Sequence, residues 1–316
     1  MAFPIIRQTS CKIICFLVVL LSGLFLVVSA CRAKEINDGM PEQFRTGFME
    51  CTFQSYDIRD ARAILEMNAK EAARLMDLNV PTKVNFFSDT EAMIMAIRKG
   101  ELELFTLPAI EYLNVRDKKV AIPIFVNGDN NGNGIQYLLI TRKDSGIRSF
   151  SDLKGKSLML PPICYFKPGH LWLDVLLLKE KKEDLESFFS AVQLLPRSSN
   201  ATLGVFFRKA DAALVTRQAF EINLQLNPQL EQNLTILAQS PFLLNEVICL
   251  AFDSTEYFRN RITNALLKYN ESKAGQQLFT IFKNAGILPF KPTYSEGLEN
   301  LIAEQNQLKT KETLKK

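Results

Sequence analysis

Short apolar runs alternate with amphipathic segments along most of the chain. Within residues 57–76, Ala61, Leu65, Ala69 and Ala72 recur at spacings of three or four, which predicts a helix with one buried face. The apolar runs between such segments are too short for helices and predict buried strands. Because strands alternate with helices, the pattern favours an α/β fold of largely parallel sheets flanked by helices.

The same pattern predicts further elements on both sides of this helix. The predicted strands are 51–56, 84–87, 102–107, 120–126, 191–195, 210–215, 234–239 and 247–252. The other predicted helices begin near residues 90, 170, 199, 254 and 273, and one more ends at Leu226. Residues 33–47 are polar and predict a tether, whereas the lysine-rich end from Lys309 predicts a frayed tail.

The segment from Tyr137 to Leu160 carries the clearest architectural signal. It joins an apolar strand, the charged turn RKDSG at 142–146, a short helix start and a second apolar strand after Lys156. No residue in it has the character of a catalyst. The segment therefore indicates the entrance to a second α/β lobe.

The N-terminus carries an export signal. Arg7 and Lys12 precede an apolar run at 13–28, which is shorter than the ~20 residues needed to span a bilayer as a helix and fits a signal-peptide core. The run ends in VSAC, which resembles the lipobox of bacterial lipoproteins, so we expect residues 1–30 to be removed and Cys31 to be lipidated. An uncleaved anchor and a plain secretory signal are the alternatives, and all three place the folded part outside the cytoplasm.

Composition narrows the function classes. A chain of 316 residues with 47% hydrophobic and 23% charged residues is typical of a globular protein of about two domains. The net charge is +4, and removal of Arg7 and Lys12 with the leader leaves +2. Nucleic-acid binders of this size show a strong basic stripe, so we expect no nucleic-acid partner. The single histidine, His170, excludes a multi-histidine metal site within the chain.

Three cysteines remain beyond the leader and the proposed anchor: Cys51, Cys164 and Cys249. They are widely spaced and odd in number, which excludes a disulfide framework and a zinc site. We expect buried free thiols, with one bridge as the alternative.

Residues 127–134 form the richest turn-forming run of the chain. Asp129, Asn131 and Asn133 copy the start of a calcium loop, but the twelfth position holds Ile140 where the pattern requires a bidentate glutamate. We therefore interpret this run as a loop where the chain crosses between lobes, with no metal.

Five motifs occur in the order that they have in a known family. They are the charged turn at 142–147, SDLKGK at 151–156, KADAA at 209–213, the Ser240-Pro241 pair and the stretch 286–292. In this order they resemble the phosphonate-type periplasmic substrate-binding proteins of ABC transporters, with matching features over residues 57–301. The resemblance implies a type II periplasmic-binding fold, in which two lobes close around a ligand.

The resemblance also implies a division of the chain. Lobe 1 would comprise 48–136 and 241–305, and lobe 2 would comprise 137–240. Residues 31–47 would form the lipid anchor and tether, and 306–316 a basic tail. The crossings would lie near Gln136-Tyr137 and at 240–246, and small ligands bind in the cleft between such lobes.

The chain departs from the family at the expected ligand pocket. Where the family has a Ser-Thr-Ser-Gly turn that binds an oxyanion, this chain has FKPG at 166–169, and Pro168 removes one N–H donor. A family tyrosine corresponds to Thr90, and the ligand-binding histidine falls near Ser198. An acidic ligand contact is retained as Glu246. The phosphonate pocket is thus predicted to be largely dismantled.

Several polar residues are candidates for the cleft. Lys167 would replace the lost hydroxyl groups as a point charge for an anion. The predicted ligand-binding residues are Glu246, Tyr137, Lys167, Ser198, Ser199, Thr90 and His170. Each of them is also compatible with a structural role, and we expect no catalytic residue and no cofactor.

The sequence thus predicts an exported, lipid-anchored, monomeric solute-binding protein without enzymatic activity. It would capture a small anionic ligand by hinge closure and deliver it to an ABC permease or a membrane sensor. One alternative is a ligand-sensing or partner-binding lipoprotein whose pocket has diverged, and another is an enzyme on this fold. A neighbouring permease gene would favour transport, and a neighbouring histidine kinase gene would favour sensing.

The lipid anchor generates the first prediction. Replacement Cys31→Ala abolishes metabolic labelling with a fatty acid and releases the protein from membranes, because the acylated side chain is gone. Unchanged membrane association would contradict the assignment of Cys31.

Overall fold

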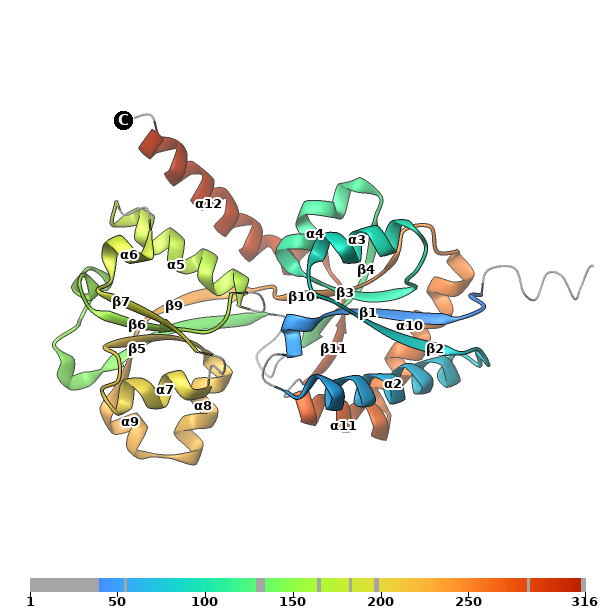
Figure 1. Cartoon of the computed structure of the whole chain (residues 1–316), viewed down its shortest axis with the longest axis horizontal. Coiled ribbons are helices and arrows are strands. Elements are labelled where there is room, and N and C mark those ends of the chain that lie inside the picture. Colours follow the sequence, from blue (N-terminus) through green and yellow to red (C-terminus); the bar gives the residue numbers. More distant parts are fainter. Residues whose placement is uncertain are drawn as a thin grey trace, which may run out of the picture.

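The computed structural model describes residues 40–53, 56–128, 134–163, 166–181, 184–195, 199–282 and 285–313. Two sheets lie side by side along its long axis, each with helices on both faces (Figure 1). The predicted two-part α/β architecture is therefore confirmed. Among the described helices, none is both long and apolar enough to cross a membrane. The predicted leader and Cys31 lie outside the described residues.

The first sheet has the strand order β11-β4-β10-β3-β1-β2. Its strands are β1 (Phe44–Met49), β2 (Thr82–Phe87), β3 (Leu104–Pro108), β4 (Ala121–Gly128), β10 (Glu246–Ala251) and β11 (Gly286–Pro289). Helices α3 (Thr90–Arg98) and α4 (Ala109–Val115) pack on one face. Helices α2 (Ile58–Leu75), α10 (Glu256–Glu271) and α11 (Lys273–Phe282) pack on the other. We call this sheet with its helices the first unit.

The second sheet has the order β7-β6-β8-β5-β9. Its strands are β5 (Ile135–Arg142), β6 (Ser157–Leu160), β7 (Ala191–Leu194), β8 (Ala212–Thr216) and β9 (Leu234–Leu243). Helices α5 (Lys167–Lys179) and α6 (Leu185–Phe188) cover one face, and α7 (Ser199–Phe206), α8 (Arg217–Leu226) and α9 (Gln229–Asn233) cover the other. This sheet and its helices form the second unit.

Both sheets are mixed rather than largely parallel. Strand β1 pairs in parallel with β2 and β3, and β6 pairs in parallel with β7 and β8. The strands that follow the crossings run the other way: β10 is antiparallel to β3 and β4, and β5 is antiparallel to β8 and β9. A strand that enters a sheet from the neighbouring unit needs no helical crossover, so antiparallel pairing is open to it.

The chain crosses between the units twice, close to the predicted places. It leaves the first sheet after Gly128 and enters the second at Ile135, and it returns between Leu243 and Glu246. The two crossings touch, because Ile135 pairs with Leu243 and a Cβ atom at position 134 would lie 2.9 Å from the Leu243 carbonyl oxygen. Position 134 therefore requires glycine. Most of the calcium-like run, 129–133, lies outside the described residues.

The prediction of the first strand was wrong. Strand β1 begins at Phe44, inside the predicted tether, and Glu50–Phe53 form a short 3₁₀ helix where a strand was expected. The charge of Arg45 obscured the strand, yet its Nε donates to Glu103 Oε1 at 3.1 Å and the pair is partly buried. A charged residue that is neutralised by a distant partner leaves no trace in local hydrophobicity.

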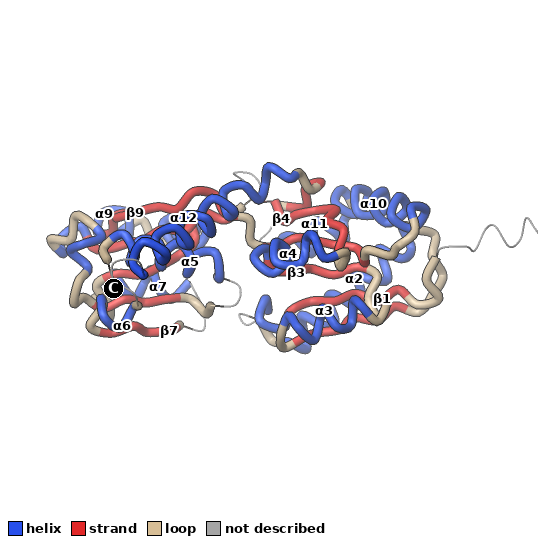
Figure 2. The backbone as a smooth tube through the Cα atoms, turned by 90° about the horizontal axis from the view of Figure 1, so that it is seen from above, coloured by secondary structure: helices blue, strands red, loops and turns tan. Residues whose placement is uncertain are grey.

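The C-terminal helix α12 (Glu296–Thr313) was also missed and joins the two units. It begins beside the first unit and runs along the second (Figures 1 and 2). Leu298 is buried in the first core and Leu301 in the second. Lys179 of α5 forms an ion pair with Glu304 at 2.8 Å. Residues 306–313 are thus helical instead of a frayed basic tail.

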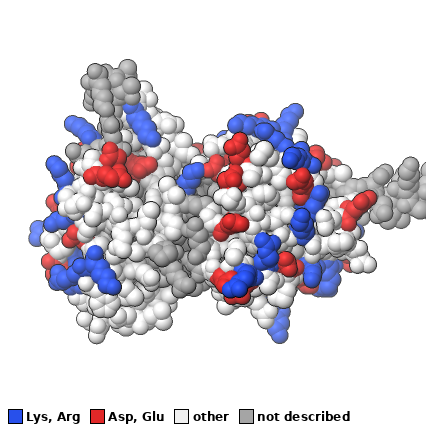
Figure 3. Space-filling view, viewed as in Figure 1, with Lys and Arg blue, Asp and Glu red and all other residues white. Residues whose placement is uncertain are grey.

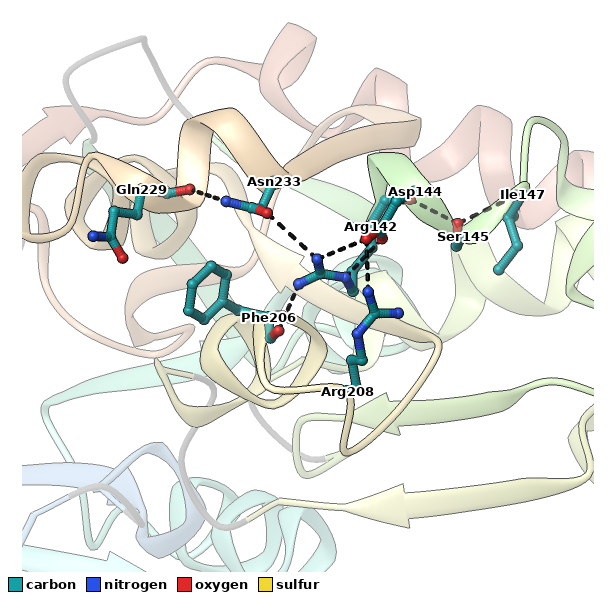
Figure 4. A network of polar contacts seen from close by, with 8 residues as sticks. All are labelled: Arg142, Asp144, Ser145, Ile147, Phe206, Arg208, Gln229 and Asn233. Carbon is teal, nitrogen blue, oxygen red and sulfur yellow. Dashed lines mark hydrogen bonds and ion pairs between the residues drawn. The ribbon is translucent and has the colours of Figure 1, made fainter.

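The charged turn after β5 has a structural role (Figure 4). Arg142 donates from Nε to Asp144 Oδ1 at 2.8 Å and from Nη1 to the Phe206 carbonyl at 2.7 Å, and Arg208 donates to Asp144 Oδ2 at 2.6 Å. These charged hydrogen bonds lower the pKa of Asp144 to about 2. The network holds the end of α7 against the turn and accounts for the charged residues of this segment without a ligand.

Charged side chains of both signs are interspersed over the face of the molecule shown in Figure 3. Blue and red atoms alternate on the first unit, and the second unit carries several separate basic and acidic groups. On this face neither sign gathers into one large patch.

The position of α12 generates a stability prediction. Leu301 is 5% exposed, so Leu301→Ala leaves a cavity under the helix and lowers the free energy of unfolding by about 2–5 kcal/mol in urea titrations. The exposed Gln307 on the same helix is the matched control, and Gln307→Ala changes it by less than about 0.5 kcal/mol. Equal effects of the two replacements would show that α12 is not docked through Leu301.

Candidate functional site

A cavity of about 580 Å³ lies where the two units meet. Its lining comes from β1, β3, β4 and β10 of the first sheet, from α2, α10 and α11, from both crossings and from one side of α8, along its whole length, in the second unit. Pockets that hold small molecules occupy about 300–1,000 Å³ and combine an apolar wall with a few polar groups. The size and the position of this cavity make it the candidate binding site.

Glu246, the first residue of β10, lines the cavity and is 7% exposed. Thr52 Oγ1 donates to its Oε1 at 3.0 Å, and Asn127 Nδ2 donates to its Oε2 at 3.1 Å. Burial disfavours the ionised form and raises the pKa of Glu246 to about 7, although both hydrogen bonds act in the opposite direction. Near neutral pH this carboxyl group is therefore able either to donate or to accept a hydrogen bond.

Two further polar side chains of the lining are buried without complete hydrogen bonding. Asn245 accepts from the Tyr137 hydroxyl group at 3.2 Å, but its Nδ2 has no hydrogen-bond partner in the described part of the chain. Thr46 Oγ1 on β1 has none there either. Buried polar atoms are paired in the great majority of cases. The cavity wall thus holds two buried polar atoms whose hydrogen-bonding capacity is unused in the described part of the chain.

Arg217 contributes a positive charge to the lining from the second unit. It follows the buried strand β8 and begins α8, and it donates to Gln136 Oε1 and, at 2.8 Å, to Gln239 Oε1. Glu221 lies 3.4 Å away on the same helix. These contacts hold the guanidinium group in place at the junction.

An aromatic cluster forms one wall of the cavity. Phe53 contacts Phe48, Phe86 and Phe282 edge to face, with ring centroids 5.6–6.1 Å apart, and Tyr56 packs against Phe282 at 5.2 Å. Such pairs hold rings in defined orientations. The wall is therefore both apolar and ordered.

Glu246 is the predicted ligand residue that lines the cavity. Tyr137 is fully buried in the neighbouring core and reaches the site through Asn245. Its ring lies so close to position 169 that a Cβ atom there would approach it to 2.5 Å, so Gly169 is required for packing.

Lys167 and His170 are engaged elsewhere. Lys167 forms an ion pair with Glu111 of α4, which connects the two units outside the cavity lining. His170 is buried, its Nε2 lies 2.9 Å from the Pro161 carbonyl oxygen, and burial lowers its pKa. Both residues thus have structural contacts in this conformation.

The remaining candidates are spread over other elements. Thr90 begins α3, on the sheet face opposite to the cavity. Ser199 begins α7, and its side chain is outside what is described, as is Ser198 altogether. The cavity does not bring these residues together with Glu246 in the part of the chain that is described.

One described cysteine is a free thiol and the other is disulfide-bonded, so each of the two sequence-based alternatives applies to one of them. Cys249 is a buried free thiol, as predicted, and burial raises its pKa. Cys51 is disulfide-bonded, which contradicts the expectation of a free thiol there and supports the alternative of one bridge. Its partner lies outside the described residues. Within the described ranges, no group of three or more histidine, cysteine or acidic side chains is placed to hold a metal ion.

Comparison with protein families identifies the relatives of the chain. The family described as "ABC transporter, phosphonate, periplasmic substrate-binding protein" matches residues 72–294. The chain belongs to this family. Its members are exported periplasmic proteins that bind small ligands and work with ABC transporters. No curated protein matches the chain.

Solved structures of similar fold confirm the type II periplasmic-binding architecture. A Xanthomonas citri protein bound to chloride has a TM-score of 0.64 at 14% identity, over 85% of this chain and 99% of that one. PhnD1 from Prochlorococcus marinus, in complex with methylphosphonate, has a TM-score of 0.61 at 17% identity, over 84% of this chain and 99% of that one. A binding component of a phosphonate ABC transporter from Pseudomonas aeruginosa has a TM-score of 0.60 at 15% identity, over 84% of this chain and 87% of that one.

Four polar residues of the cavity wall were not predicted from the sequence: Arg217, Asn127, Asn245 and Thr52. Arg217 had a usable signal, because it directly follows a buried strand, where ligand contacts of α/β proteins gather. Asn127 and Asn245 lie at the two crossings and were assigned to loops, and Thr52 was assigned to a strand that does not form. Thr52 and Asn127 reach Glu246 from 194 and 119 residues away in the sequence, a distance that local pattern does not record.

The raised pKa of Glu246 generates a prediction about stability and pH. The folded protein keeps this proton up to about pH 7, whereas the unfolded chain releases it near 4.5, so stability present below pH 4.5 is lost as pH rises to 7. Glu246→Gln removes this loss. The unfolding free energy of the variant minus that of the unchanged protein therefore increases by up to about 3 kcal/mol between pH 4.5 and pH 7.

Urea titrations at pH 4.5, 6 and 7.5 measure this difference. Glu231→Gln at an exposed position is the matched control and leaves the pH dependence unchanged. A constant difference between Glu246→Gln and the unchanged protein over the whole range would contradict the burial of an ionisable group at this site.

Proposed function

We propose that the chain is a lipid-anchored solute-binding protein that captures a small anionic ligand in the cavity and delivers it to an ABC permease. The observation that carries this proposal is the composition of the cavity wall. Glu246 from the first unit and Arg217 from the second line the same space. A ligand that contacts both would favour the closed arrangement of the units, and differential contact is what shifts such an equilibrium.

Arg217 supports an anionic head group. Guanidinium groups bind carboxylate and phosphonate oxygens through paired N–H donors, and those of Arg217 are already oriented by Gln136 and Gln239. Glu246 is compatible with an anion because its protonated form donates a hydrogen bond near neutral pH. Asn245 Nδ2 offers another donor in the same wall.

The crossings supply the hinge in this proposal. The connections at 128–135 and 243–246 are the places where the two units exchange chain, and a few residues in such segments absorb the change of backbone angles on closure. We propose lobes close to the division predicted from sequence, with closure over the cavity. The binding cycle involves no covalent chemistry, so we propose no enzymatic activity, and a monomer suffices for it.

Delivery and anchoring complete the proposal. The export signal and the VSAC sequence at Cys31 support attachment to the outer face of a membrane, where a permease would be reached by diffusion in two dimensions. The polar stretch after Cys31 would serve as a tether that ends before Phe44.

A second candidate function is ligand sensing or partner binding on the same fold. It is favoured by the turn at 166–169, where the family's oxyanion-binding hydroxyl groups are absent and Lys167 is paired with Glu111 instead of facing the cavity. In that case the closed form would be recognised by a membrane sensor rather than by a permease.

Thermal unfolding in the presence of candidate ligands tests the binding proposal. A panel of phosphonates, phosphate esters and carboxylates contains at least one member that raises Tm, because a ligand bound only to the folded state stabilises it by mass action. Arg217→Gln reduces that increase by more than half, whereas Arg98→Gln, at an exposed position on α3, preserves it. No increase for any member would overturn anion capture and favour the second function.

A further inference from the structure

The cavity at the junction continues from the cleft into the first unit. Beyond Glu246 it runs between the first sheet and helices α2, α10 and α11. We call this part the inner chamber. Its described lining includes Phe44, Leu65, Ala69, Leu266, Phe279 and Ile287. All six are buried apolar residues.

Polar groups are concentrated at the entrance of the inner chamber. Glu246, Asn127 and Thr52 are joined by hydrogen bonds there, and Asn245, which precedes Glu246, has no partner for its Nδ2 in the described residues. At the other end, the Tyr269 hydroxyl group donates to Asn68 Oδ1 and is satisfied within the wall. The cavity therefore has a polar entrance and a largely apolar interior, which also carries the polar side chains of Thr46, Asn68 and Tyr269.

The interior of a folded domain normally leaves few voids larger than a water molecule. A space lined by aromatic and aliphatic side chains forfeits their dispersion contacts, and water inside it finds few hydrogen-bond partners. Phe48, Phe53 and Phe282 of the same lining pack against one another edge to face. An apolar group from a ligand would restore the lost contacts.

We propose that the ligand is an amphiphile, with an anionic head beside Arg217 and Glu246 in the cleft and a hydrocarbon tail in the inner chamber. This inference rests on the proposed function and adds the chemical class of the ligand. A single-methyl compound, such as the methylphosphonate in the Prochlorococcus marinus structure, would leave the inner chamber of this chain unfilled.

The length of the tail is the variable that tests this proposal. Calorimetric titrations use n-alkylphosphonates from methyl to decyl, each below its micelle concentration, at pH 6, where Glu246 is mostly protonated. The protein carries Cys31→Ala so that it brings no acyl chain of its own. Each added methylene group tightens Kd about fourfold until the chamber is full, since burial of one CH₂ contributes about 0.8 kcal/mol. A parallel series of n-alkanols shows the effect of the tail without a charged head.

The possible outcomes separate this inference from the proposed function. If methylphosphonate binds and longer tails give no gain, the amphiphile is wrong and anion capture stands. If the alkanols bind with the same gain per methylene while the phosphonates do not bind, the ligand carries no anionic head. Anion capture and the anionic part of the amphiphile proposal are then both overturned. If neither series binds, both proposals are overturned.

A variant that fills the inner chamber provides the second measurement. Ala69 on α2 lines the chamber, and Ala69→Leu lowers the affinity for decylphosphonate at least tenfold while that for methylphosphonate stays within twofold. Ala63→Leu makes the same change on the exposed side of the helix and preserves both affinities. If Ala69→Leu does not fold, Ala72→Leu, also in the lining, replaces it. Unchanged decylphosphonate binding in a folded variant would overturn the position of the tail.

Discussion

The close contact between the two crossings is the constraint on which the rest of the structure depends. Ile135 pairs with Leu243, and only a glycine fits at position 134 against the Leu243 carbonyl group. This contact fixes where β5 and β10 begin, and therefore places Gln136 and Glu246 at the same junction. Arg217 is held there in turn by Gln136 and Gln239, which come from the paired strands β5 and β9. The cavity is thus a consequence of how the chain passes between the sheets.

Helix α12 adds a second connection between the units. It buries Leu298 in one core and Leu301 in the other, so a change in the angle between the units would have to move it relative to at least one of them. The ion pair between Lys167 and Glu111 also bridges the units. The hinge closure that we propose would therefore act against contacts on the α12 side, while the cavity lies on the other face of the first sheet.

The polar groups of the cavity explain why family membership does not determine the ligand. The turn at 166–169 has lost its hydroxyl groups, and its lysine is paired away from the cavity. A buried carboxyl group, unpaired polar atoms and many apolar side chains line the cavity instead. Such a site discriminates among ligands by tail as well as by head.

Much of the fold was predictable from local pattern, but little of the site was. The helix at 58–75 and the strands around 84, 104 and 247 follow from periodicity that the core enforces. Strand β1 was not predictable in this way, because the charge of Arg45 is neutralised by Glu103, which lies 58 residues away in the sequence. Among the polar residues that line the cavity, Glu246 was the one predicted through the family resemblance. Arg217 and Asn127 line the same cavity as Glu246 only because the chain passes twice between the sheets, and the distance of 119 residues between Asn127 and Glu246 hides their contact from local pattern.

A crystal structure of the protein with octylphosphonate tests the central claim most directly. We expect the phosphonate group within hydrogen-bond distance of Arg217 and the alkyl chain between the first sheet and helices α2 and α11. Density for the phosphonate at the 166–169 turn, or a tail that extends into solvent while the inner chamber stays empty, would contradict it.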